Sequence, residues 1–248
     1  VYLTSVTEEW SVATLSGPHA GKILKAAGVD ISLDPADFPF MTMREAHIAG
    51  LPVRIFRISF TGELSYEINI RARHGLALWT HLMEAGAEYG ITPYGTEAMH
   101  VLRAEKGFII VGQETDGSVT PQDLGMDWIV SKVKPDFIGK RALARGSMSA
   151  EDRKQLVGLR TKDRKTVIPE GAHAVLDPNQ PMPMEMLGQI TSSYYSPNLG
   201  ASLAMAMLKG GRALMGGTVY MPMLDGTLIE AEVVEPVFYD PKGERING

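Results

Sequence analysis

The apolar residues of this chain repeat with two different periods, and the change between them limits what the chain can fold into. Up to about residue 145, strand-like alternation is mixed with the helical spacing of Leu76, Trp79 and Leu82. Beyond that point, apolar segments are short, favour β-strands and are bounded by Gly or Pro. We therefore predict an α+β part with an antiparallel sheet and helices, residues 1–148, followed by a small C-terminal β-barrel, residues 149–248.

The same patterns predict individual elements. In the first part we expect a strand at residues 10–15, a helix that has Ser16 as its N-cap and ends at Gly28, and helices near residues 76–83 and 98–102. Three further strands, at residues 41–48, 53–60 and 64–70, are expected to pair as antiparallel neighbours. Six strands are expected in the second part, at residues 155–160, 172–176, 188–193, 202–208, 218–221 and 228–234.

Composition excludes several classes of function. The 248 residues include 24 Lys and Arg against 29 Asp and Glu, a net charge of -5 that offers no attraction for nucleic acid or an anionic membrane. The chain has no Cys, which excludes disulfides, thiolate metal sites and a cysteine nucleophile. No signal peptide is recognisable, and no apolar run reaches the ~20 residues of a membrane span, so we expect a cytoplasmic protein.

The common short motifs of catalysis and metal binding are missing. None of the six His residues forms a His-x-x-x-His pair, so no metal site is expected. The Gly pairs at 210–211 and 216–217 lack the order of a dinucleotide-binding loop, and no Gly-x-Ser-x-Gly elbow occurs. Residues 160–165 contain a cluster of basic side chains, which we interpret as part of a solvated loop. The alternative is that the cluster contacts an anionic ligand or partner.

Glu67 is the residue that departs most from the expected pattern. If residues 64–70 form a strand, Tyr66 and Ile68 share one face, while Glu67 shares the other with Ser65 and Asn69. A carboxylate in the middle of a strand is costly to bury unless a donor pairs with it. The paired N–H groups of a planar ligand edge, such as a pterin or guanine, would match it. The alternative is an edge strand with Glu67 in water.

Four segments in order carry a resemblance to a known family. They are residues 60–67 (Phe-Thr-Gly-Glu-Leu-Ser-Tyr-Glu), residues 102–107 (Leu-Arg-Ala-Glu-Lys-Gly), Thr120-Pro121 with Trp128 downstream, and residues 188–192 with Ser196-Pro197. Together they resemble the glycine-cleavage aminomethyltransferases. The Glu-Lys-Gly variant and residues 136–143 are similar to the branch fused to amine-oxidising flavoproteins, and most of all to the C-terminal region of sarcosine oxidase α subunits.

This resemblance implies a tetrahydrofolate site and names its residues. Glu67 falls where the family carboxylate binds the pterin, and Trp128 where an aromatic ring packs on the folate. Phe60 replaces a pocket tyrosine and keeps the ring face without the hydroxyl. Tyr239 matches a C-terminal tyrosine contact, whereas Met99 stands where aminomethyltransferases carry an arginine. Tetrahydrofolate is thus the expected cofactor.

The resemblance also implies a reaction and its partners. In the parent enzyme, a flavin elsewhere would oxidise the N-methyl group of sarcosine, and this region would capture the one-carbon unit as 5,10-methylenetetrahydrofolate. Flavin, NAD and the other subunits of a heteromeric oxidase would lie outside this chain, as would the family's catalytic aspartate. We therefore expect no catalytic residue here and little turnover by the isolated chain. The alternatives are an aminomethyltransferase or dimethylglycine oxidase-type folate domain, and a non-catalytic folate-sensing or assembly module.

Overall fold

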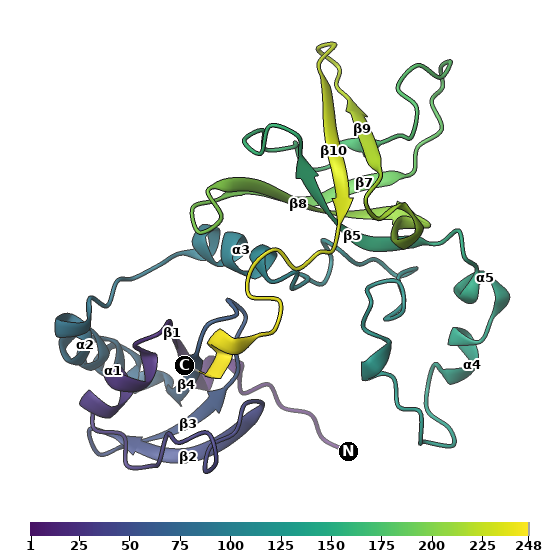
Figure 1. Cartoon of the computed structure of the whole chain (residues 1–248). Coiled ribbons are helices and arrows are strands. Elements are labelled where there is room, and N and C mark those ends of the chain that lie inside the picture. The colour runs from purple at the N-terminus through teal and green to yellow at the C-terminus, as the bar shows by residue number, and fades with distance from the viewer. Residues whose placement is uncertain (248) are drawn as a thin grey trace. The chain divides into compact units, whose positions relative to one another are not determined.

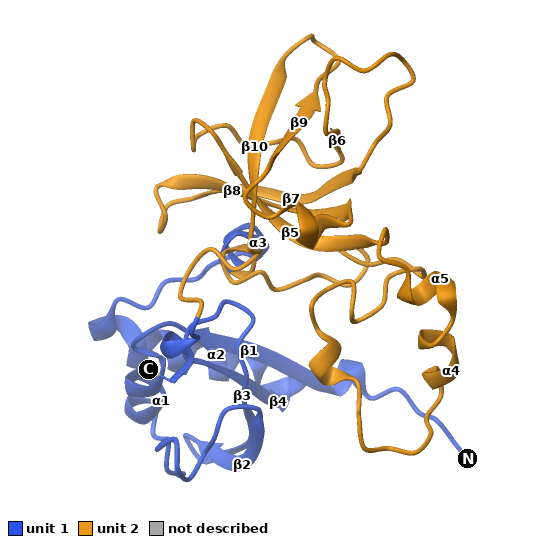
Figure 2. Cartoon of the chain, turned by 45° about the vertical axis from the view of Figure 1, so that its right-hand side comes forward, with its two compact units in different colours: residues 1–102, 242–248 blue, residues 103–241 orange. Residues whose placement is uncertain are grey.

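The structure, a computed structural model, describes residues 1–247 and contains two compact units. Residues 1–102 together with 242–248 form the first, and residues 103–241 form the second (Figure 2). The domain boundary that we expect between residues 148 and 149 stays a prediction. Each compact unit is described below by itself.

The first unit is an antiparallel sheet with two helices, and its elements are labelled in Figure 1. The sheet has the strand order β1-β4-β3-β2, formed by β1 (Trp10–Ser16), β2 (Thr42–Ile48), β3 (Leu51–Arg57) and β4 (Ser65–Arg71). Helix α1 (Ala20–Ala26) follows β1, and α2 (Gly75–Gly86) follows β4. A third helix, α3 (Thr96–Glu105), runs across the residue at which the units are divided.

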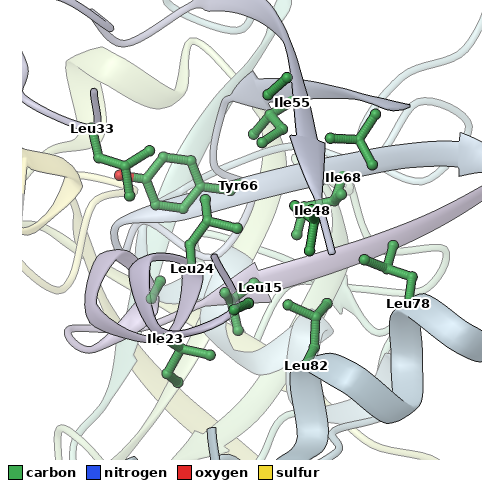
Figure 3. Close-up of a cluster of buried hydrophobic side chains, with 14 of the residues drawn as sticks. Leu15, Ile23, Leu24, Leu33, Ile48, Ile55, Tyr66, Ile68, Leu78 and Leu82 are labelled. Atoms are coloured by element: carbon green, nitrogen blue, oxygen red, sulfur yellow. The ribbon is translucent and has the colours of Figure 1, made fainter. Parts of the chain in front are cut away.

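One face of this sheet forms the core of the first unit. Apolar side chains of β1, β3 and β4 meet those of α1 and α2 in a buried cluster that includes Leu15, Leu24, Ile55, Tyr66 and Leu82 (Figure 3). The clustering follows from the period-two alternation of the strands and the helical spacing of α1 and α2. The opposite face carries the polar residues of β4 together with some apolar side chains, among them Val12 and Phe56.

Two local predictions for the first unit are wrong. The strand expected from residue 53 begins two residues earlier, and it is joined to β2 by a two-residue turn, because Ile48 pairs with Leu51. Ala49 and Gly50 both have positive φ, of 50° and 77°, as a type I′ hairpin turn requires. Ser16 does not cap α1, since His19 precedes that helix and the Ser16 hydroxyl bonds to Thr61 instead.

The second unit is built on a six-stranded antiparallel sheet with the order β6-β7-β8-β5-β10-β9. Its strands are β5 (Lys154–Thr161), β6 (His173–Ala174), β7 (Gly188–Ser196), β8 (Ala201–Lys209), β9 (Thr218–Pro222) and β10 (Leu228–Val234). Val175, directly after β6, and Tyr220, within β9, exchange backbone hydrogen bonds of 2.8 and 3.0 Å. The sheet therefore closes into the small barrel predicted from the sequence, around buried residues such as Leu159, Ala206 and Val233.

The connection before the barrel contains two short helices, α4 (Lys140–Leu143) and α5 (Gly146–Ser149). A smaller cluster on the outside of β5 and β8, formed by Ala104, Leu156, Leu203, Met205 and Met207, packs with residues from the 109–124 segment and with Phe238. This cluster fixes the end of α3 and the following loop onto the barrel.

Candidate functional site

The side chains of β4 separate onto two faces of the first sheet, as the sequence predicts. Tyr66, Ile68 and Ile70 are at most 1% exposed and belong to the core. Ser65, Glu67 and Asn69 alternate with them and therefore lie on the face without the two core helices. The strand thus presents a row of three polar side chains on one surface and a continuous apolar row on the other.

Glu67 lies at the centre of this polar row and of the sheet. Strand β4 pairs with β1 on one side and β3 on the other, which places Glu67 opposite Thr14 and Phe56. The alternative of an edge strand is therefore wrong. Glu67 is half-buried, and its carboxylate accepts no hydrogen bond and forms no ion pair within residues 1–247. Its oxygen atoms are left to a ligand or to water.

The neighbours of Glu67 in the row also have unused polar atoms. The hydroxyl of Ser65 and the amide nitrogen of Asn69 are both buried and have no hydrogen-bond partner in the described structure. Buried polar atoms without partners are uncommon in folded proteins, because the lost hydration is not replaced. Their position beside an unpaired carboxylate fits a ligand that carries both donors and acceptors along one edge.

Tyr94, which is distant from β4 in sequence, lies near this polar row in the first unit. Tyr94 precedes α3, and its phenol lies near Ser16 at the end of β1. The Ser16 hydroxyl lies 2.7 Å from the hydroxyl of Thr61. Burial raises the pKa of the Tyr94 phenol, the negative charge of Glu67 raises it further, and the nearby Ser16 hydroxyl opposes both. Tyr94 is therefore a neutral phenol beside the carboxylate.

Tyr94 also lines a cavity of about 530 Å³ within the first unit. Thr14 and Ser16 contribute from the outer edge of β1, and Trp79 and Met83 from α2. The walls combine apolar rings with a few hydroxyl groups, the character of many small-molecule sites. Glu67 does not line the cavity, but its strand partner Thr14 and its electrostatic neighbour Tyr94 do.

The other three residues that the family resemblance points to lie in different places. Phe60 is half-buried in the connection between β3 and β4, beyond the end of the strand in which the sequence places it. Trp128 and Tyr239 belong to the second unit. Trp128 is 73% exposed in a 3-10 helix, Asp127–Ile129, whereas the backbone N–H of Tyr239 donates to the carbonyl of Glu105 at 2.9 Å. A shared ligand for all four residues remains a proposal.

The motif at residues 102–107 holds the second unit together. Arg103 forms an ion pair with Glu114 at 3.2 Å, and it donates to the Ser192 hydroxyl at 2.6 Å. Glu105 accepts hydrogen bonds from Ser196 at 2.5 Å and from Asn198 at 3.0 Å. Ser192 and Ser196 belong to β7 and Asn198 follows it, so the charged side chains at the end of α3 attach it to the barrel.

Two further charged residues in family-like segments also have structural partners. Lys106 donates to the carboxylate of Asp240 at 3.1 Å. Asp123 accepts the Thr120 backbone N–H at 2.7 Å and pairs with Arg153 at 2.5 Å. The charged residues in these segments of the second unit therefore pair with other residues of that unit, whereas Glu67 in the first unit has no such partner within residues 1–247.

Within residues 1–247, no three His, Asp or Glu side chains gather in a way that could hold a metal ion. None of the helices in that range combines the length and apolar composition of a membrane span.

Two residues of the site were not found by sequence reasoning. Tyr94 comes from a Pro-Tyr-Gly turn that carries no recognisable chemistry, and nothing in its neighbourhood links it to Glu67. Asn69 was placed on the correct face, but only the structure shows that its amide nitrogen lacks a partner. The alternation of β4 was the available signal for Asn69, and none was available for Tyr94.

Comparison with known families agrees with this architecture. Residues 1–134 match the GCVT N-terminal domain, and residues 154–240 match the glycine cleavage T-protein C-terminal barrel domain. The chain belongs to the glycine cleavage T-protein family. Within this family its whole length is similar to sarcosine oxidase α subunits, with 46% identity over 255 residues to the subunit of Corynebacterium sp. strain P-1.

The match covers 100% of this chain but only 26% of that subunit. Human mitochondrial dimethylglycine dehydrogenase is 32% identical over 99% of this chain and 28% of its own length. The aminomethyltransferase of Halothermothrix orenii is 31% identical over 94% of this chain and 62% of its own length. The chain therefore corresponds to one region of these longer proteins.

A solved structure shares the fold. The crystal structure of the glycine cleavage system aminomethyltransferase T from Bartonella henselae matches with a TM-score of 0.78 at 25% sequence identity. It covers 94% of this chain and 60% of the other. The predicted aminomethyltransferase-like fold, with an antiparallel sheet, helices and a C-terminal barrel, is confirmed.

Proposed function

We propose that this chain is the tetrahydrofolate-binding region of a heteromeric sarcosine oxidase. In that enzyme it would capture the one-carbon unit released by oxidative demethylation of sarcosine as 5,10-methylenetetrahydrofolate. The similarity to sarcosine oxidase α subunits along the whole chain supports the choice of parent enzyme. Flavin, NAD and the remaining subunits would belong to other parts of that assembly.

The observation that carries the proposal is the unpaired, half-buried carboxylate of Glu67. The pterin of a folate has a planar edge with adjacent N–H donors, and a carboxylate accepts two parallel hydrogen bonds from such an edge. A charged acceptor in the middle of a central strand has little reason to be kept there without a ligand, because its desolvation is not compensated by the protein. Binding of the pterin would supply the missing donors.

The polar atoms beside Glu67 fit the same ligand. The amide nitrogen of Asn69 is a donor and the hydroxyl of Ser65 can donate or accept, and both are buried without protein partners. A pterin ring carries carbonyl and ring-nitrogen acceptors next to its donor edge. Phe60, Trp128 and Tyr239 are proposed to supply the aromatic contacts, with Phe60 offering a ring face and no hydroxyl.

In this reaction the protein would bind tetrahydrofolate and position it. Bound tetrahydrofolate supplies the nucleophilic nitrogens that accept the one-carbon unit. Glu67 would hold the pterin in one orientation, so that these nitrogens face the source of the unit at a high effective concentration. A site that also excludes water would disfavour hydrolysis of the one-carbon unit to free formaldehyde.

The proposal is tested by replacing Glu67 with Gln and measuring tetrahydrofolate binding to the full chain by calorimetry under anaerobic conditions. The substitution keeps the shape of the side chain but removes the charge and one acceptor. We expect a loss of affinity of about 2 kcal/mol, or roughly 30-fold, as for hydrogen bonds to a charged group.

Glu45→Gln is the matched control. Glu45 lies on the same sheet, its side chain is 74% exposed, and it pairs with Arg54 at 3.5 Å. This variant is expected to bind folate like the unchanged chain. An identical isotherm for the Glu67→Gln variant and the unchanged chain would contradict the assignment of the site.

A further inference from the structure

We propose that the C-terminal segment, residues 242–247, positions the connection between β3 and β4 for ligand binding, with Arg245 as the positioning residue through its ion pair with Glu63. The inference rests on the proposed folate site at Glu67. It adds to that site a residue that follows Glu63 by 182 positions in the chain. The inference follows from where the pairing of β3 and β4 ends and from what the charged residues of the connection bind.

The connection between β3 and β4 begins at the proposed site itself. The pairing of the two strands ends at Phe56 and Glu67, so residues 57–66 lie outside it. Ser65 and Tyr66 already belong to β4 but pair only with β1. The direction in which β4 enters the centre of the sheet at Glu67 therefore depends on the conformation of residues 57–66.

The C-terminal segment binds this connection through an ion pair. Residues 242–248 belong to the first compact unit, and they end in a short 3-10 helix, Glu244–Asn247 (Figure 2). In this helix the Nε atom of Arg245 pairs with the Oε1 atom of Glu63. The Glu63 side chain is only 17% exposed, so solvent screens this pair less than it screens a pair on an open surface.

Arg57, the last residue of β3, binds the same segment from the start of the connection. Its guanidinium group donates to the carbonyl of Asn247 at 3.4 Å and to the carbonyl of Phe38 at 2.7 Å. Arg57 is 1% exposed, and its Nε atom has no hydrogen-bond partner in the part of the chain that the structure describes. It forms no ion pair within residues 1–247. A buried cation without a carboxylate depends on the few acceptors it has, and Asn247 supplies one of them.

The connection is thus fixed from two directions. On one side the hydroxyl of Thr61 lies 2.7 Å from that of Ser16 in β1. On the other side the C-terminal segment binds Arg57 and Glu63, and Phe60 lies between these two residues in sequence. Fixing the connection limits the conformations of Phe60 and of the strand that carries Glu67. A site that is already held in its binding conformation loses less conformational entropy when the ligand binds.

The first test is a double-mutant cycle on tetrahydrofolate binding by the full chain. Arg245→Ala is expected to weaken binding about 5-fold, a typical size for residues that act on a site without touching the ligand. Glu63→Ala should weaken it equally, and the double variant should bind no worse than either single variant, because both changes break the same pair. Arg245→Lys keeps the positive charge and should retain most of the affinity.

Lys242→Ala is the matched control for Arg245→Ala. Lys242 carries the same charge on the same segment, is exposed, and forms no ion pair within residues 1–247. We expect this variant to bind folate like the unchanged chain. A loss equal to that of Arg245→Ala would show that folate, an anion, responds to the net charge alone, and it would overturn the positioning role.

The second test is hydrogen exchange without ligand, which distinguishes positioning from overall stability. Arg245→Ala should speed amide exchange in residues 58–66 and leave the exchange of β2 and β3 unchanged, because the ion pair fixes only the connection. Faster exchange throughout the first unit would mean that the variant is simply less stable, and it would overturn the positioning role.

The outcomes separate the two proposals. If Glu67→Gln loses affinity while Arg245→Ala binds normally, the folate site stands and the positioning role is overturned. If Glu67→Gln binds normally, the folate site is overturned, while faster exchange confined to residues 58–66 in Arg245→Ala would still support the fixing of the connection by the C-terminal segment. Losses from both variants, together with that confined exchange, would support both proposals.

Discussion

Arg103 and Glu114 form an ion pair of 3.2 Å in which neither side chain has any exposed surface. Ser192 bonds to both, and Gln113 also donates to its hydroxyl, at 3.0 Å. Through Ser192 of β7, the pair joins the end of α3 and the segment after it to the barrel of the second unit. Because no water reaches it, removing one partner leaves the other charge buried and uncompensated.

Replacing Glu114 with Ala is therefore expected to lower the free energy of unfolding by about 3–5 kcal/mol. The control is Glu9→Ala, which breaks an ion pair with Arg71 of 2.6 Å whose side chains are 58% and 50% exposed. That change should cost about 0–1 kcal/mol, since exposed pairs contribute little. Urea unfolding of the three proteins measures both values, and equal costs would contradict the importance of burial.

Two buried serines differ only in their partners and make a second comparison. The Ser65 hydroxyl has no partner, whereas the Ser192 hydroxyl bonds to Arg103, Glu114 and Gln113. We expect Ser65→Ala to change the free energy of unfolding by less than about 0.5 kcal/mol or to increase it, because an unsatisfied polar atom is removed. Ser192→Ala should lower it by about 1–3 kcal/mol.

A destabilised Ser65→Ala variant would show that the Ser65 hydroxyl has a partner in the ligand-free protein. The same variant also reports on the proposed site. If the hydroxyl contacts bound folate, the variant should keep its stability and lose affinity in the binding assay used for Glu67.

Gly107 ends the 102–107 motif just after α3, and two features disfavour a larger residue there. Its φ is +66°, and a Cβ atom would lie 2.6 Å from the carbonyl oxygen of Pro236. Gly90 has a similar φ of +72° but open space around the same position. Gly90→Ala should cost about 1–2 kcal/mol of backbone strain, and Gly107→Ala about 1–3 kcal/mol more because of the clash. Similar midpoints in thermal unfolding would contradict this difference.

Asp123 is expected to make the free energy of unfolding of the second unit decrease as the pH becomes acidic. Burial raises the pKa of its carboxyl group, but hydrogen bonds from Arg153 and Thr120 outweigh this and hold the pKa below its ordinary value of 3.8. A lowered pKa in the folded state means that ionised Asp123 stabilises the protein at higher pH. This contribution is lost as the pH falls through the folded-state pKa.

The measurement compares the unfolding free energies of the unchanged chain and the Asp123→Asn variant across acid pH. The difference should be constant above about pH 5 and shrink below about pH 4. A difference that stays the same throughout would show that Asp123 titrates alike in the folded and unfolded chains.

Local pattern was sufficient for most of the strands and for the direction of Glu67. Because side chains alternate in any strand, the sequence around Tyr66 and Ile68 already placed Glu67 on the other face. Turn and cap details were predicted less well. Ser16 has the composition of an N-cap, but its hydroxyl bonds to Thr61, which is 45 residues away in sequence. A competing partner that arrives through folding cannot be seen in a local window.

The segments that resemble the family differ in what their charged residues do. Arg103, Glu105 and Lys106 are charged residues in a segment that resembles the glycine-cleavage aminomethyltransferases, which by itself suggests ligand contact. In the structure, each of these three side chains instead forms a hydrogen bond or an ion pair with another residue of the second unit. The difference lies in solvent access and in long-range partners, which a motif does not specify.

The sequence by itself determined the α+β and barrel architecture, the family and the face on which Glu67 lies, because each depends on residue order and on the fixed periods of helix and strand. Tertiary structure decided that Glu67 lies in a central strand, half-buried and unpaired within residues 1–247, and that Tyr94 lies near it. It also decided that Arg103 forms an ion pair with Glu114. These facts depend on which strands pair and which distant segments meet. They result from packing over the whole chain, because burying a polar atom without a hydrogen-bond partner costs free energy and a partner restores it.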